Sequence, residues 1–247
     1  MDVLNLSRQF FLLTCYTLAF LALGIISSPQ GLADGEKKPN FVFIFADDQA
    51  YNTIGDLEVE TPNLDRLIRQ GTTFTHAYNQ GCWHEAVCIA SRNMLNSGRF
   101  LWHAQKNAQN LETERAAGRF WSEYLKQAGY DTFFSGKWHL QADVQSAFDH
   151  VRHVRPGMPK DRPTGYNRPI EGEPDPWKPW ETSEGGYWSG GKHWSEVLAD
   201  DACDYLQKNS QRENPFFMYV AFNAPHDPRQ SPKEFVDRYP LASISLP

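Results

Sequence analysis

The segment NFVFIFADD, residues 40–48, places an almost unbroken apolar run directly before two aspartates. Such a run predicts a strand that is buried on both faces of a parallel sheet. Asp47 and Asp48 then follow the strand at its carboxyl end, the edge where open α/β sheets bind their ligands. The segment therefore predicts a fold class and also the place where a functional site should lie.

Helix and strand patterns alternate along the rest of the chain. The expected helices are 61–71, one entered near 91–95, 120–128 and 194–207, and the expected strands are 73–78, 130–134 and 215–222. Strands that alternate with helices predict an α/β fold, a mostly parallel sheet flanked by helices. Residues 150–192 are dense in Pro, Gly, Trp and Tyr, break this pattern and are expected to form an insertion.

Length and charge limit the classes of protein to which the chain can belong. Its 247 residues are enough to bury a sizeable core. Its formal net charge of -6 argues against a nucleic-acid partner, which requires clustered positive charge. The same charge is compatible with a small anionic substrate held in a local positive pocket.

The first 33 residues have the features of a targeting segment. Arg8 precedes an apolar run over residues 10–26, and Gly31-Leu32-Ala33 supplies the small residues that are typical of a cleavage site. We expect residues 1–33 to be a signal peptide, so that residues 34–247 are exported to the periplasm or secreted. A membrane anchor is the less favoured alternative because the run is short for a bilayer span, and no stable membrane partner is expected.

Three cysteines follow this leader: Cys82, Cys88 and Cys203. An odd number in an exported protein leaves one thiol unpaired. No C-x-x-C pair is present, which argues against a zinc ribbon. If Cys88 is used chemically, Cys82 and Cys203 remain as a possible disulfide, although the sequence does not fix their separation.

Polar side chains follow several predicted strands or begin a predicted helix. They are Asp47 with Asp48, Cys88 with Arg92, Lys137 with His139, and His226. In a mostly parallel sheet, groups at the carboxyl ends of strands meet at one edge. We therefore expect these side chains to form one site.

Five segments together resemble the sulfatase family of the alkaline phosphatase superfamily. They are PNFVFIFADDQ (39–49), TPNLDRLIRQGTTFTHAY (61–78), CIASRNMLNSGR (88–99), AGYDTFFSGKWHL (128–140) and APHDP (224–228). The resemblance implies an alkaline-phosphatase-like fold and a calcium-dependent hydrolase of sulfate esters. Family members run well beyond residue 247, so it also implies that residues 34–247 are the N-terminal part of a catalytic domain. The remaining metal ligands and the rest of the sheet are expected outside this chain.

By this resemblance, Asp47, Asp48 and residue 88 bind the metal, calcium rather than magnesium. Oxygen ligands suit such a hard cation. Cys88 corresponds to the cysteine that a maturation enzyme oxidises to formylglycine, whose hydrate attacks the sulfate sulfur. The family pattern Cys-x-Pro-Ser-Arg is here Cys88-Ile89-Ala90-Ser91-Arg92. The alanine bears on which maturation system acts on the chain.

The resemblance also implies roles for the basic residues. Arg92 stabilises the modified side chain and the metal site, and Lys137 contacts the sulfate. His139 binds the second hydroxyl of the nucleophile, while His226 holds the sulfate or protonates the leaving oxygen.

Several alternatives remain open from the sequence. The substrate is expected to be a sulfated carbohydrate or a small sulfate ester. A related phosphodiesterase or phosphohydrolase of the same superfamily is one rival, although those enzymes use Thr or Ser as nucleophile. A truncated, inactive sulfatase-like exported protein is the other. The aromatic residues of 150–192 either form a platform for sugar rings or pack the insertion onto the domain.

Overall fold

The computed structural model describes residues 37–55, 58–83, 87–159, 163–170, 172–188, 191–209 and 211–244. The chain divides into two units, Met1–Lys38 and Pro39–Pro247, and the sheet and the candidate site both lie in the second. The expected signal peptide lies outside the described residues. Within the described part of the chain, no helix is both long and apolar enough to cross a membrane.

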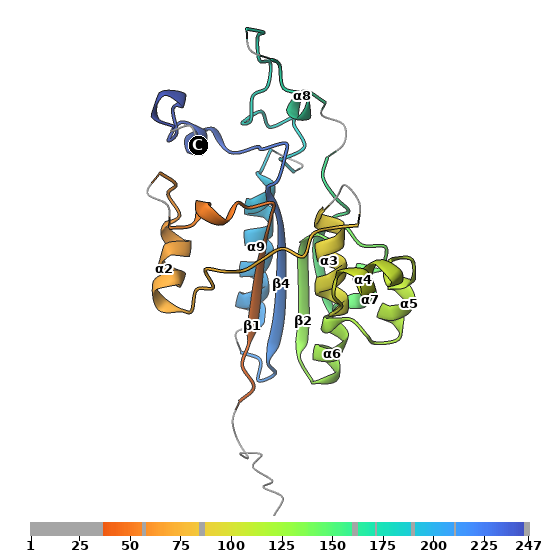
Figure 1. The fold of residues 1–247 in the computed structure, drawn as a ribbon. Helices are drawn as coiled ribbons and strands as arrows, with labels where there is room; N and C mark the ends of the chain where they lie inside the picture. The colour runs from red at the N-terminus through yellow and green to blue at the C-terminus, as the bar shows by residue number, and fades with distance from the viewer. Residues whose placement is uncertain are drawn as a thin grey trace, which may run out of the picture. The chain divides into compact units, whose positions relative to one another are not determined.

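A parallel sheet forms the centre of the second unit. Its strands are β1 (Phe41–Asp47), β4 (Phe216–Pro225), β2 (Asp131–Lys137) and β3 (His150–Arg155), in that order across the sheet. Figure 1 shows β1, β4 and β2 side by side. Each neighbouring pair is parallel. This arrangement confirms the predicted α/β fold with a parallel sheet flanked by helices.

The helices agree with three of the sequence predictions to within about two residues. The α-helices are α2 (Pro62–Gln70), α3 (Val87–Ser97), α4 (Leu101–Asn107), α5 (Leu111–Ala116), α6 (Trp121–Gln127), α7 (Val144–Ala147), α8 (Pro163–Tyr166), α9 (Trp194–Asn209) and α10 (Lys233–Val236). Short 3-10 turns lie at Tyr51–Thr53, Ala108–Asn110 and Leu241–Ser243. The helix predicted near 91–95 is α3, and it begins early enough to include Cys88.

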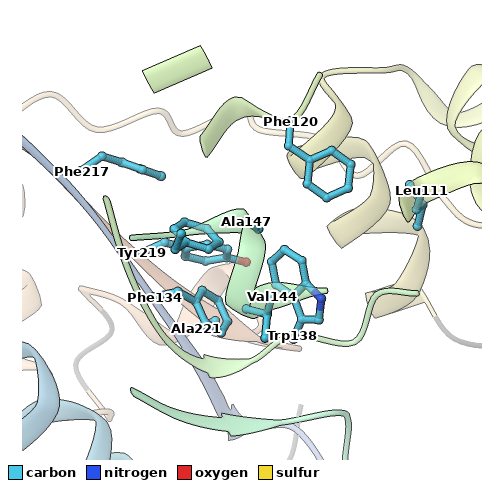
Figure 2. Packing of buried hydrophobic residues seen from close by; sticks show 10 residues of the cluster. Leu111, Phe120, Phe134, Trp138, Val144, Ala147, Phe217, Tyr219 and Ala221 are labelled. Atoms are coloured by element: carbon cyan, nitrogen blue, oxygen red, sulfur yellow. The ribbon is translucent and has the colours of Figure 1, made fainter. Parts of the chain in front are cut away.

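Two hydrophobic cores cover the two faces of the sheet. On one face, Phe134 of β2 and Tyr219 of β4 pack with Trp138 (Figure 2). Phe148 belongs to the same cluster. On the other face, α9 covers the sheet with residues such as Leu198. Successive strand residues point to opposite faces, so β2 and β4 contribute alternate side chains to both cores.

The burial predicted for the first strand is wrong. β1 lies at the outer edge of the sheet, and Val42 and Ile44 are 52% and 56% exposed. Phe43 and Phe45 point to the opposite face and pack against the first core. Helix α9 packs on β4, β2 and β3. The strand that is buried on both faces is β4, which has a run of consecutive buried residues.

Two further expectations need correction. Residues 73–78, predicted as a strand, are irregular and exposed. Residues 150–155 form β3, so the irregular stretch begins later than predicted. Four of the six residues of β3 (HVRHVR) are basic, so its sequence lacks the apolar pattern that predicts a strand.

The aromatic residues of the predicted insertion are mostly packed. Trp177 and Tyr187 are only 8% and 9% exposed. For these two residues the structure favours packing onto the domain over a platform for sugar rings.

We expect Leu198→Ala to destabilise the protein by about 2–5 kcal/mol, because Leu198 is fully buried and its removal leaves a cavity. Leu206, on the same helix and 40% exposed, provides the matched control, and its replacement by alanine should cost no more than about 0.5 kcal/mol. Urea denaturation followed by circular dichroism measures both. Equal losses for the two variants would contradict the packing of α9.

Candidate functional site

The carboxyl edge of the sheet gathers the polar residues. β1 ends at Asp47, β2 ends at Lys137, and β4 ends one residue before His226. Asp47 is in register with Pro225 of β4. Helix α3 begins at the same place and carries Cys88 in its first turn.

Three side chains form a tight group at this edge. Ligand atoms of Asp47, Cys88 and His226 all lie within 4.8 Å of one another. A fourth residue, His139, places its Nδ1 atom 3.4 Å from the Cys88 sulfur. The cysteine thus lies beside two histidines and one carboxylate.

The Asp47 carboxylate is buried and receives two cations. The Lys137 ammonium and the Arg92 Nη2 atom both contact its Oδ2 atom, the latter at 3.3 Å. Arg92 also donates from Nη1 to the carbonyl oxygen of Lys137 at 2.7 Å and to the Tyr219 hydroxyl at 3.2 Å. Two buried cations against one carboxylate leave a local excess of positive charge, which favours an anionic ligand.

The environment of Cys88 favours its thiolate. Burial raises the pKa of the thiol. Hydrogen bonds with His139 and His226, together with the charge of Lys137, outweigh burial and lower the pKa from 9.0 to about 5. The contact with Cys88 in turn raises the pKa of His226. Residue 88 is therefore surrounded by groups that stabilise negative charge on its side chain.

Two residues at this edge have an unusual backbone conformation. Asp48 and His139 have φ angles of 58° and 55°, in the left-handed region that residues other than glycine rarely adopt. Such a conformation costs of order 1–3 kcal/mol and persists only where the surroundings hold it. Strained residues of this kind are often found at functional sites.

Six of the seven predicted site residues share one region. Cys88, Arg92, Lys137, His139, His226 and Asp47 are linked by the contacts above. Asp48 is exposed and does not belong to the group of potential metal ligands. The expected pair of carboxylates is thus not assembled within the described residues.

Tyr219 is a site residue that sequence reasoning missed. Its ring packs in the core while its hydroxyl accepts from Arg92. Burial raises the pKa of Tyr219 to about 12, so its hydroxyl stays neutral. Only its position in a strand that ends at the site could have suggested this role.

The possible disulfide is not formed. Cys82, Cys88 and Cys203, the three cysteines within the described residues, are all free.

Comparison with known proteins identifies relatives of the chain. The family model described as Sulfatase matches residues 39–244. An ulvan-active sulfatase of Formosa agariphila is 30% identical and aligns with 86% of this chain and 40% of that protein. An N-acetylglucosamine-6-O-sulfatase of Bacteroides thetaiotaomicron is 28% identical, with 91% and 37% covered. The chain thus spans about 40% of the length of these relatives.

Two solved structures extend the comparison. The crystal structure of Ps i-CgsB has a TM-score of 0.60 and 26% identity, with 84% of this chain and 50% of that chain covered. A phosphonate monoester hydrolase of Agrobacterium radiobacter has a TM-score of 0.50 but only 16% identity, with 85% and 45% covered. The second likeness concerns the fold alone.

We expect Lys137→Met to destabilise the protein by about 3 kcal/mol, because it removes one partner of a buried ion pair and leaves Asp47 with Arg92 alone. Urea denaturation measures the change. Lys192→Met is the matched control, since the pair of Lys192 with Asp200 is exposed and its loss should leave the midpoint unchanged. A Lys137 variant as stable as the control would show that the pair is not needed for folding.

The pKa of about 5 predicts that unmodified Cys88 reacts with iodoacetamide almost as fast at pH 6 as at pH 8. Peptide mass spectrometry resolves this cysteine from the others. In His139→Ala one stabilising hydrogen bond is lost, so the pKa should rise and the reaction should accelerate steeply between pH 6 and pH 8. A wild-type rate that climbs steeply over that range would contradict the assigned environment.

Proposed function

Because this chain belongs to the sulfatase family, as its five segments indicated, we propose that it hydrolyses a sulfate ester with a nucleophile made from Cys88. One observation carries the proposal. Cys88 lies beside two histidines and beside a buried carboxylate that pairs with two cations. A monoanionic sulfate ester needs such a surplus of positive charge, and its reaction needs a nucleophile at the same point.

We propose that residue 88 acts as formylglycine. In this form it supplies a hydrated aldehyde, an oxygen nucleophile for the sulfur of the ester. A maturation enzyme that oxidises Cys88 is therefore a required partner. The cysteine is half-buried in the first turn of α3, and an extended chain would present it more readily. We infer that the modification precedes folding.

A divalent cation fits this site in part. The donors that meet here are an Asp47 oxygen, the residue 88 side chain and a His226 nitrogen. Sulfur and imidazole suit calcium poorly, but oxidation of Cys88 replaces the sulfur with oxygen. We propose that Asp47 and residue 88 hold calcium, with magnesium less suited, and that Asp48 joins them by turning its exposed carboxylate inward. When bound, the cation would polarise the sulfate oxygens and the nucleophile.

The remaining residues have roles that follow from their positions. Lys137 and Arg92 neutralise Asp47 and leave positive charge for the sulfate oxygens. His139 contacts residue 88 and is placed to hold or remove a proton from its oxygen. His226, which also lies close to residue 88, would give a proton to the leaving ester oxygen.

The substrate we propose is a sulfated carbohydrate, with a small sulfate ester as the simpler alternative. Support comes from the relatives that are named for ulvan and for N-acetylglucosamine. A polymeric substrate of this kind is met outside the cytoplasm, which agrees with the signal peptide proposed for residues 1–33.

The test is turnover of an aryl sulfate by the purified chain in calcium, after co-expression with a maturation enzyme. We expect activity that is lost in Cys88→Ala and when a chelator removes calcium. Cys203→Ala, an exposed cysteine far along the chain, should retain it. Peptide mass spectrometry across residue 88 should show an aldehyde in place of the thiol.

Two outcomes would overturn the proposal. An aldehyde at residue 88 without any turnover would mean that the chain is an inactive sulfatase-like protein. Faster hydrolysis of an aryl phosphate or phosphonate than of the sulfate would favour the phosphohydrolase alternative.

A further inference from the structure

A buried asparagine near the end of β4 contacts the segment that lies against the His139 ring and the turn that carries His226. Asn223 is 5% exposed and lies three residues before His226. Its side-chain Nδ2 atom donates to the carbonyl oxygen of Gly157 at 3.0 Å, and the Met158 sulfur lies at the same distance. Its backbone carbonyl accepts from the N–H of His226 at 3.1 Å.

The backbone of Gly157 lies against the ring of His139. A Cβ atom at Gly157 would lie 3.3 Å from Nε2 and 3.4 Å from Cδ2 of that ring. The Nδ1 atom of the same ring faces the Cys88 sulfur at 3.4 Å. The imidazole is therefore confined between the cysteine and the Gly157 backbone.

His139 needs such confinement because its backbone is strained. Its φ angle of 55° is in the left-handed region, and such a conformation persists only where surrounding groups hold it. The segment at Gly157, whose carbonyl oxygen accepts from Asn223, forms a wall against the ring on the side away from Nδ1.

The orientation of the Asn223 amide is fixed by its other partner. Trp194 donates from Nε1 to the Asn223 Oδ1 atom at 2.9 Å. An indole N–H can only donate and a carbonyl oxygen can only accept, so the amide must point its NH2 group at Gly157. Trp194 is 2% exposed and belongs to the core under α9, which gives the amide a rigid base.

We propose that Asn223 is a positioning residue that couples the two histidines beside residue 88. Its side chain holds the Gly157 wall against His139, and its carbonyl fixes the turn that carries His226. The catalytic importance of this coupling rests on the function proposed above. The coupling itself is a property of the fold, and its test requires no turnover.

The test is nuclear magnetic resonance of the full, metal-free chain, with histidine and glycine labelled and other residues deuterated. Asn223→Asp keeps the acceptor for Trp194 but turns a carboxylate oxygen towards the Gly157 carbonyl. We expect it to abolish the cross-peak between the Gly157 Hα protons and the His139 ring. The ring signals of His139 and His226 should shift, while that of His150 stays in place.

The chain offers a matched control in Asn96. This buried amide also accepts from a tryptophan, Trp121, at 3.0 Å and donates to a backbone carbonyl, that of Arg92, at 2.9 Å. Asn96→Asp breaks the same kinds of bond inside α3, where no histidine is held. It should leave the His139 and His226 signals unmoved.

Gly157→Ala is a second variant, which changes the contact with His139 while leaving the Asn223 side chain unaltered. The added methyl group meets the His139 ring, so the His139 signal should shift while the His226 signal does not. The proposal is overturned if Asn223→Asp leaves both histidines unmoved, or if Asn96→Asp moves them as much. It is also overturned if His139 does not respond to Gly157→Ala. Absence of sulfatase turnover would leave all three results unaffected, so the two proposals fail separately.

Discussion

The buried carboxylate of Asp47 is the group on which the rest of the site depends. Arg92 reaches from α3 to this carboxylate on β1, to the Lys137 carbonyl on β2 and to the Tyr219 hydroxyl on β4. One guanidinium thus ties the helix to three strands. Burying an arginine and a lysine without a partner would cost several kcal/mol for each ion, so Asp47 makes their burial possible. The surplus positive charge that remains favours an anionic ligand.

The two outer strands of the sheet, β1 and β3, differ in residue type and in whether α9 packs on them. β3 has basic residues at four of its six positions, as is common for an edge that does not pair further. β1 is apolar, and α9 covers β4, β2 and β3. Val42 and Ile44 therefore remain exposed among the described residues, although the same strand ends in the most buried acid of the site.

Strain and charge act together at residue 88. The backbone of His139 has a left-handed conformation, and its side chain contacts Cys88. His226, in the turn after β4, forms a hydrogen bond with the same cysteine. The thiolate that results is stabilised by neighbours rather than by solvent, since burial alone would raise its pKa. The same neighbours suit an oxygen nucleophile at this position, because they stabilise negative charge whichever atom carries it. A site of this kind needs a rigid frame, and the buried amide of Asn223 supplies one part of it.

The sequence by itself determined the α/β class, the main helices and the family, because strand and helix periodicity and the order of the five segments are local properties of the chain. It also indicated Cys88, Arg92, Lys137, His139 and His226, since polar residues that follow parallel strands meet at one edge. Only the tertiary structure decided that β1 is an edge strand, that residues 73–78 form no strand and that HVRHVR forms β3. It also left Asp48 exposed and gave Tyr219 and Asn223 their partners. These outcomes depend on which element covers which face and on contacts between residues far apart in the chain, and no local pattern contains that information.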